Sequence, residues 1–231
     1  MRLLLFDIDG TLLHSGGAGR RALARALESV FGPTALERWP LAGKTDRQIC
    51  REVLRAAGWD EQAIERGLPE ALARYPALLE DELARGEPHT LPGVPALLAR
   101  LRADSRYALG LLTGNVRAGA QRKLAAVGIA ADAFCAGGAF GCDAEDRNAL
   151  PAIALRRAER AVGRRFAPHE TIVIGDTPRD VACGRHAGTR TLAVATGPHD
   201  AAALTAAGAD RVLPDLARTD AVLATLEALA G

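Results

Sequence analysis

Two aspartates near the N-terminus have the type and spacing needed for metal binding and for nucleophilic or acid/base chemistry. Asp7 and Asp9 lie in the string DIDGT, residues 7–11, directly after an aliphatic run from Arg2 to Phe6. Where a strand ends, positions two apart can point the same way, so both carboxylates would face one pocket while Gly10 permits a sharp turn. Such a pair suits metal binding, nucleophilic attack and proton transfer.

Polar residues follow two further aliphatic runs. Thr113, Gly114 and Asn115 come after residues 108–112, and one hydroxyl with two backbone N–H groups at a strand-to-helix turn suits the oxygens of a phosphoryl group. Asp176 follows the run 171–174 and is a candidate metal ligand. Asp180 would lie at a helix start, where it could hold a metal-bound water, orient a cation or favour the helix dipole.

The elements that must position these residues alternate from about residue 90 onward. Buried strands are predicted over residues 2–6, 108–112, 171–174 and 189–195, with a short last strand over 211–213. Helices are predicted between them over residues 94–102, 116–127, 150–162 and 181–187. This alternation indicates an α/β fold, a doubly wound and mainly parallel sheet with its polar strand ends gathered at one edge.

The stretch from residue 15 to residue 88 shows no convincing strand and reads as successive helices rich in Ala, Leu, Arg and Glu. We predict a core domain of residues 1–14 and 89–231 with a helical insertion, residues 15–88, between its parts. Within the insertion, Thr45 with Gln48 forms a capping-box pattern for a helix that ends at Gly58. Glycines 137, 138 and 141 suggest a flexible loop near Cys142.

Composition excludes several functional classes. The chain has 231 residues, with 29 basic and 28 acidic side chains, and no dense Lys/Arg run, so nucleic acid is not an expected partner. The four cysteines form no CxxC pair and are expected to be reduced thiols. The N-terminal apolar run is too short for a membrane span, so we expect a cytoplasmic protein, monomeric or homodimeric, without a membrane partner.

Three strings, FDIDGTL at residues 6–12, LLTGN at 111–115 and IGDTPRD at 174–180, resemble the first, second and fourth motifs of the haloacid dehalogenase superfamily. The insertion falls where a helical cap lies in that family, close to the phosphoglycolate phosphatase type. The resemblance implies a Rossmann-like core and a Mg²⁺-dependent phosphatase acting on a small phosphate ester. It further implies that Asp7 becomes a phosphoaspartate, that Asp9 is the acid and base, and that Asp7, Asp9 and Asp176 hold the Mg²⁺.

The sequence departs from the family at the third motif, which is normally a lysine that neutralises phosphate. The chain has only Lys44 and Lys123. Lys123 is predicted to be a solvated helix residue, and Arg147, just before a helix, occupies the expected place and would grip phosphate oxygens. Lys44 and Asp46 resemble a cap loop that reaches the substrate, although Thr45 and Asp46 also suit a helix start.

Other activities share part of this pattern. A phosphoryl-transferring mutase of the β-phosphoglucomutase type has the same landmarks and is barely separated by sequence. A haloalkanoate dehalogenase does not require Asp9, and a phosphonatase needs a nucleophilic cap lysine, whereas Asp46 would keep Lys44 protonated. A receiver-like phosphate-sensing module, which is not an enzyme, also uses clustered Asp, Thr and a cation, but the insertion argues against it.

Overall fold

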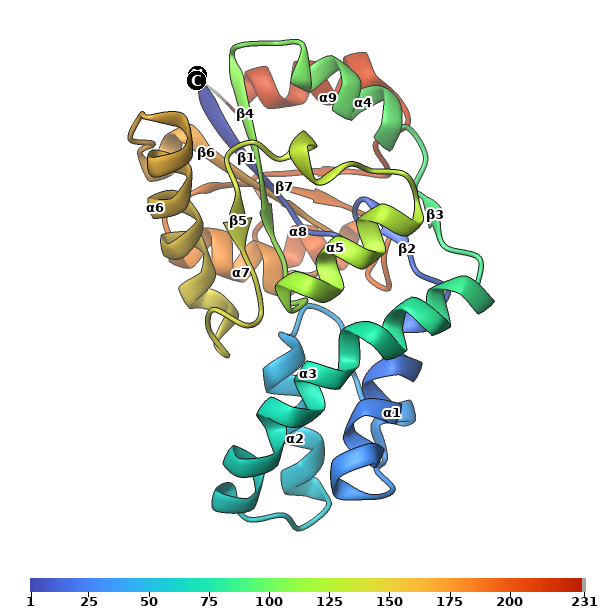
Figure 1. Cartoon of the computed structure of the whole chain (residues 1–231). Coiled ribbons are helices and arrows are strands. Elements are labelled where there is room, and N and C mark those ends of the chain that lie inside the picture. The colour runs from blue at the N-terminus through green and yellow to red at the C-terminus, as the bar shows by residue number, and fades with distance from the viewer. Residues whose placement is uncertain (230–231) are drawn as a thin grey trace.

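The computed structural model describes residues 1–229 of the chain and shows one six-stranded parallel sheet covered by helices on both faces (Figure 1). The strand order is β5-β4-β1-β6-β7-β8, with β1 at the centre. The strands of this sheet are β1 Arg2–Phe6, β4 Tyr107–Leu112, β5 Gly138–Ala139, β6 Thr171–Gly175, β7 Arg190–Val194 and β8 Arg211–Leu213. The predicted α/β fold with a mainly parallel sheet is confirmed.

Two helical layers bury the faces of the sheet, because its central strands are aliphatic on both sides. One layer packs with Phe6, Leu109 and Ile172 in an apolar cluster, and the other packs with Leu5 and Val173. The first layer consists of α4 Val94–Arg102, α5 Arg117–Ala126 and α9 Thr219–Ala228. The second consists of α6 Leu150–Val162, α7 Pro178–His186 and α8 Ala201–Ala206.

The insertion, residues 15–88, carries helices that pack mainly on one another, and Figure 1 shows it beside the edge of the sheet. Its helices are α1 Ala18–Phe31, α2 Asp46–Ala56 and α3 Glu61–Arg85, with a short 3₁₀ turn over Leu36–Arg38. They share an apolar cluster around Leu27, Leu54 and Tyr75. The boundaries that we predicted for the two domains stay a prediction.

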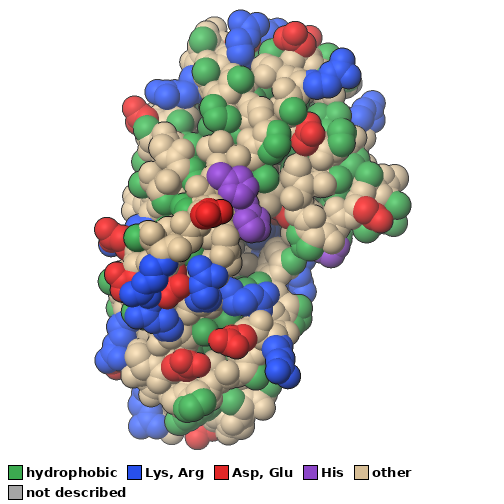
Figure 2. All heavy atoms as spheres, turned by 90° about the vertical axis from the view of Figure 1, so that its right-hand side faces the viewer, with side chains coloured by type: hydrophobic (Ala, Val, Ile, Leu, Met, Phe, Trp, Pro, Cys, Tyr) green, Lys and Arg blue, Asp and Glu red, His purple; other side chains and the backbone are tan. Residues whose placement is uncertain are grey.

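Two short strands join the insertion to the core. β2 Leu13–His14 and β3 His89–Thr90 pair antiparallel, with Leu13 opposite Thr90 and His14 opposite His89. The two histidine rings lie 5.6 Å apart, and the space-filling view shows His side chains side by side where the two halves of the molecule meet (Figure 2). The two segments that connect the core with the insertion are therefore paired side by side.

One loop prediction is wrong. Gly138–Ala139 forms β5, which pairs with β4 at the edge of the sheet, rather than part of a flexible loop. Gly141 lies against the backbone of Gly114, where a Cβ atom would collide with the Gly114 carbonyl. These glycines therefore allow close backbone approach, which is a second common reason for glycine beside a strand.

Candidate active site

A cavity of about 550 Å³ lies between the carboxyl edge of the sheet and the insertion. Strand ends and helix starts from the core supply most of its polar wall, and residues from all three helices of the insertion and from the loop before α2 close it. The core contributes Asp7, Asp9, Thr113, Asn115, Lys123, Arg147 and Asp176, and the insertion contributes Arg20, Lys44, Asp46 and Tyr75. The predicted gathering of polar strand ends at one edge is thus present.

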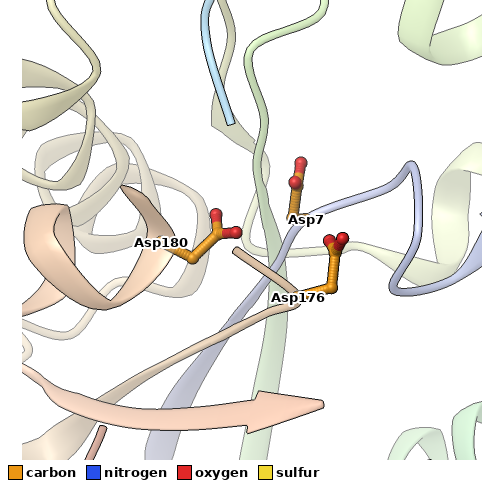
Figure 3. A group of neighbouring side chains, drawn as sticks. All are labelled: Asp7, Asp176 and Asp180. Carbon is orange, nitrogen blue, oxygen red and sulfur yellow. The ribbon is translucent and has the colours of Figure 1, made fainter. Parts of the chain in front are cut away.

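Three acidic side chains converge beside this cavity, and two of them, Asp7 and Asp176, line it (Figure 3). Asp7 follows β1, Asp176 follows β6, and Asp180 comes from the first turn of α7. Each offers a carboxylate oxygen, and these oxygens all lie within 4.8 Å of one another. All three residues are buried.

Gly10 allows this arrangement. Its φ is +76°, in the left-handed region that favours glycine, and a Cβ atom there would collide with the Asp176 carboxylate. Thr11 then donates a hydrogen bond from Oγ1 to Asp176 Oδ1 at 3.1 Å. The turn after β1 therefore both clears space for Asp176 and fixes it.

Burial and crowding of negative charge disturb the ionisation of this acidic cluster. Burial raises the pKa of Asp7 to about 6 against the opposing effect of Arg147, and Asp180 and Asp9 raise it further. Burial, with Asp180 and Asp7 beside it, raises the pKa of Asp176 well above its usual range. A hard divalent cation with oxygen ligands would offset this charge, so the three carboxylates could hold a divalent metal ion.

Arg147 lies beside the first aspartate, and its predicted contact with phosphate stays a prediction. It begins a 3₁₀ turn just before α6, is 4% exposed, and places Nη2 3.2 Å from Asp7 Oδ2. The same nitrogen forms an ion pair with Asp180. A planar cation that already contacts the Asp7 carboxylate is well placed to contact an anion bound there.

Asp180 stabilises the start of α7 and also orients a cation, Arg147. Its Oδ2 accepts hydrogen bonds from the Thr177 backbone N–H at 3.0 Å and from Thr177 Oγ1 at 2.6 Å, and Thr177 Oγ1 accepts one from the Asp180 N–H. This is the capping box of α7. Its other oxygen orients Arg147, so Asp180 links a helix start to the cation of the site.

Asp9 lies apart from the acidic cluster and is held by three donors. Its Oδ2 accepts hydrogen bonds from Lys123 Nζ at 2.7 Å and from Asn115 Nδ2 at 2.8 Å, and its Oδ1 accepts one from Ser15 Oγ at 3.3 Å. Burial would raise the pKa of Asp9, but Lys123, Asn115 and Ser15 outweigh it and hold the pKa below its usual range. The cluster of possible metal-binding carboxylates therefore does not include that of Asp9.

The prediction that Lys123 is a solvated surface residue is wrong. Lys123 is 4% exposed, and its Nζ also donates to Asn115 Oδ1 at 2.6 Å. Its helix, α5, has Ala120 and Leu124 buried beside it. Lys123 comes seven residues after Val116 and three after Ala120, so all three lie on one face of the helix. This periodicity was the sequence signal for a buried Lys123.

The turn after β4 is packed against the insertion. Thr113 Oγ1 accepts hydrogen bonds from Asn115 Nδ2 at 2.8 Å and from the Asn115 N–H at 3.3 Å. The Gly114 carbonyl accepts a hydrogen bond from the Asp46 N–H at 2.8 Å. The three residues predicted to bind phosphate thus line the cavity as one connected turn.

The two candidate residues of the insertion already have protein partners. Lys44 forms an ion pair with Glu52, and Asp46 Oδ2 accepts a hydrogen bond from the Val116 N–H at the start of α5. The expected helix start is confirmed, since Thr45 Oγ1 accepts from the Gln48 N–H at 3.1 Å. The same hydroxyl donates to the Glu145 carbonyl, so this segment contacts the core at several points.

Comparison with known proteins agrees with this geometry. The model of one family, described as haloacid dehalogenase-like hydrolase, matches residues 1–188. The chain is 30% identical over 224 residues to a phosphoglycolate phosphatase from Synechococcus elongatus, covering 92% of each protein. Among solved structures, a hydrolase from Pseudomonas syringae superposes over 100% of both chains with a TM-score of 0.72 and 22% identity. The superposition with a putative β-phosphoglucomutase from Bacteroides vulgatus includes 100% of this chain and 90% of that protein, with a TM-score of 0.70 and 22% identity.

Proposed function

The chain belongs to the haloacid dehalogenase-like hydrolases and is an enzyme of the phosphatase type, and we propose that it hydrolyses a small organic phosphate monoester through a phosphoaspartate on Asp7. The observation that carries this proposal is the placement of Arg147, 3.2 Å from the Asp7 carboxylate at the base of the cavity. An anionic carboxylate attacks an anionic phosphate only where positive charge is fixed nearby.

In the first step, a carboxylate oxygen of Asp7 forms a bond to phosphorus while the bond from phosphorus to the ester oxygen breaks. Asp9 gives a proton to the departing oxygen, so an alcohol leaves. Lys123 and Asn115 favour the ionised form of Asp9. A phosphate dianion bound beside it favours the protonated form that this step needs, since a like charge raises the pKa of a carboxyl group.

In the second step, water attacks the phosphorus of the phosphoaspartate and gives its proton to Asp9. The bond from phosphorus to Asp7 then breaks, which restores the carboxylate and releases inorganic phosphate. The low pKa of Asp9 suits the ionised form that accepts this proton from water. Thr113, Gly114, Asn115 and Arg147 are proposed to hold the phosphoryl oxygens in both steps.

Magnesium is the proposed cofactor. Asp7, Asp176 and Asp180 offer the oxygen ligands that converge in the structure, and Asp9 remains a proposed ligand from the sequence. The ion would supply positive charge to the phosphoryl oxygens as a Lewis acid. Asp180 already has one oxygen on Arg147 and the other at the start of α7, so Arg147 would fix its carboxylate as a ligand of the ion.

The insertion is proposed to act as a cap that selects the substrate, with Lys44 and Asp46 at the end remote from phosphorus. The curated relative from Synechococcus elongatus is named a phosphoglycolate phosphatase, so phosphoglycolate is the first substrate to test. A cytoplasmic location is part of the proposal. Among residues 1–229, the structure contains no helix that is long and apolar enough to cross a membrane.

The testing experiment is a screen of phosphate monoesters, phosphoglycolate included, with Mg²⁺ and with EDTA. We expect release of inorganic phosphate that depends on Mg²⁺ and is abolished in Asp7→Asn. Isomerisation of a sugar phosphate without phosphate release would favour the mutase. Uptake of about one phosphate per chain, released slowly, would favour the receiver-like module. Substantial activity in Asp7→Asn would remove the central claim.

A further inference from the structure

The buried lysine of α5 has no assigned part in the proposed reaction, although its ammonium group touches the proposed acid and base. Lys123 Nζ lies 2.7 Å from Asp9 Oδ2 and 2.6 Å from Asn115 Oδ1. The side chain of Asp9 is 40% exposed, whereas that of Lys123 is 6% exposed. The carboxylate therefore opens on the cavity while the lysine holds it from behind.

The geometry points to Lys123 as the positioning residue that fixes the Asp9 carboxylate for proton transfer and that makes this fixation depend on the seating of the insertion. This inference rests on the proposed function, because it gives Lys123 its role through Asp9. It differs from the role of Arg147, which contacts Asp7 instead.

The first argument is that Asp9 has few other restraints. Asp9 follows the end of β1 and precedes a glycine turn, so neighbouring side chains must set the direction of its carboxylate. Asn115 Nδ2 supplies a second short hydrogen bond to Asp9. The Lys123 ammonium group can only donate, and its bond to Asn115 Oδ1 leaves the amide nitrogen of Asn115 facing Asp9. Lys123 thus binds the Asp9 carboxylate directly and also orients its second donor.

The second argument is that the insertion contributes the far wall of the lysine site. A Cβ atom on Gly19, in the first turn of α1, would lie 2.9 Å from Lys123 Nζ and 3.6 Å from the Tyr75 hydroxyl of α3. Gly119 of α5 leaves similar room for the Tyr75 ring. Two glycines on facing helices therefore let α1 and α3 close over the ammonium group.

A third observation concerns charge. Asp46 of the insertion is 8% exposed and interacts electrostatically with Lys123, so the lysine is attracted both to Asp9 of the core and to Asp46. When the insertion is seated as in this structure, the Lys123 side chain is 6% exposed and both carboxylates favour its charge. Movement of α1 and Asp46 away from the core would expose Lys123 and weaken its hold on Asp9.

The experiment compares Lys123→Met with Arg122→Met on p-nitrophenyl phosphate, in steady state and in the first turnover. Arg122 is the adjacent residue of α5, is half-buried and pairs with Glu80 at 3.2 Å, an interaction of small energetic value. The first step with this substrate needs little proton donation, because its leaving group is stable as an anion. The second step still needs Asp9 as the base.

For Lys123→Met we expect a burst of about one p-nitrophenolate per active site, followed by steady-state turnover that is at least about tenfold slower than in Arg122→Met. The upper limit is the contribution of Asp9 itself, about 10²- to 10⁴-fold. Steady-state rates equal to those of Arg122→Met would overturn the inference. Equal loss of the burst and of steady-state turnover would also overturn it, because Asp7 would then be disturbed as well.

Gly19→Ala tests the same contact without removing the lysine. Alanine favours a helix by about 1 kcal/mol over glycine, so α1 should not be weakened. The new methyl group should displace Lys123 Nζ and reproduce the burst with slow turnover. Wild-type turnover in Gly19→Ala would contradict the coupling to the insertion. These outcomes are distinct from failure of the proposed function, in which the wild type would release no phosphate or Asp7→Asn would remain active.

Discussion

The Arg147 guanidinium lies 3.2 Å from the Asp7 carboxylate, and both side chains are buried at the end of the central strand. The same guanidinium contacts Asp180, so one cation faces two carboxylates in a site that would receive a phosphate. Burial opposes the charged form of Arg147, but Asp180 and Asp7 outweigh it and raise the pKa of Arg147 above its usual value. The cation is therefore permanent at any working pH.

Arg147→Ala should lower kcat/KM by about 10²- to 10³-fold, which corresponds to a loss of about 2.7 to 4 kcal/mol of transition-state stabilisation. This is the usual effect of losing one electrostatic donor. It should also lower the free energy of unfolding by about 3 to 5 kcal/mol, because Asp7 and Asp180 lose a buried partner. Arg147→Lys should recover part of both losses, since the charge returns without the planar fork. Arg157→Ala is the control, because Arg157 pairs with Asp143 away from the cavity. Equal kinetics for Arg147→Ala and Arg157→Ala would refute this role.

Asp9→Asn should lose turnover by about 10²- to 10⁴-fold, because an amide can neither donate nor accept the proton. Asn still fits the space beside Asn115 and Lys123, so Asp7 should remain correctly placed and the first turnover with p-nitrophenyl phosphate should persist. The measurement is rapid-mixing kinetics at saturating substrate. Turnover at the wild-type rate would assign proton transfer to another group.

The carboxyl group of Asp46 should make stability depend on pH. Burial raises the pKa of Asp46 to about 6, from an ordinary value of 3.8. Between these values the folded protein holds more protons on this group than the unfolded chain, so its contribution to stability falls as the pH rises from about 4 to 6. Asn cannot ionise and can still accept the hydrogen bond of Val116.

Asp46→Asn should therefore match the wild type near pH 4 and become more stable above pH 6. A gap of about two pH units sets the difference at no more than about 3 kcal/mol. Urea unfolding of both proteins at pH 4, 5, 6 and 7 measures it. A stability difference that stays constant over this range would show that Asp46 does not titrate there.

Gly114→Ala should disturb the contact between the turn after β4, which is proposed to bind phosphate, and the insertion. A Cβ atom at this position would collide with the Lys44 carbonyl and lie 3.1 Å from Thr45 Cα. Such overpacking typically costs about 1 to 3 kcal/mol. We expect KM to rise and unfolding free energy to fall together, as measured by steady-state kinetics and urea unfolding. Unchanged KM with lowered stability would mean that the insertion does not influence substrate binding.

The fold was largely predictable because each central strand is an uninterrupted aliphatic run that ends in a polar or glycine residue. The helices over 94–102 and 150–162 matched residue for residue, and α7 began three residues earlier than expected because Pro178 is compatible with a helix start. The strand β5 was missed, since two small residues, Gly138 and Ala139, give no hydrophobic run. Its pairing is set by β4, which local sequence does not reveal.

The candidate site likewise contains residues that local sequence predicts and residues whose placement depends on tertiary packing. Asp7, Asp176 and Arg147 were predictable because each follows a strand or precedes a helix of the core. The environment of Lys123 depends on how α1 and α3 pack on α5, which is a tertiary property, and its charge argued for solvent. The direction of the Asp9 carboxylate, toward Lys123 rather than toward the acidic cluster of Asp7, Asp176 and Asp180, depends on the same packing.

The paired strands β2 and β3 carry a consequence for how such proteins diversify. The chain leaves the core at His14 and returns at His89, which lies opposite His14 in the β2–β3 pair. The six-stranded sheet is therefore complete without any residue of the insertion. A module grafted between two adjacent anchor points leaves the parent scaffold undisturbed. Replacement of residues 15–88 by a different helical module could therefore change what the cavity admits, while the phosphoryl chemistry of the strand ends is inherited intact.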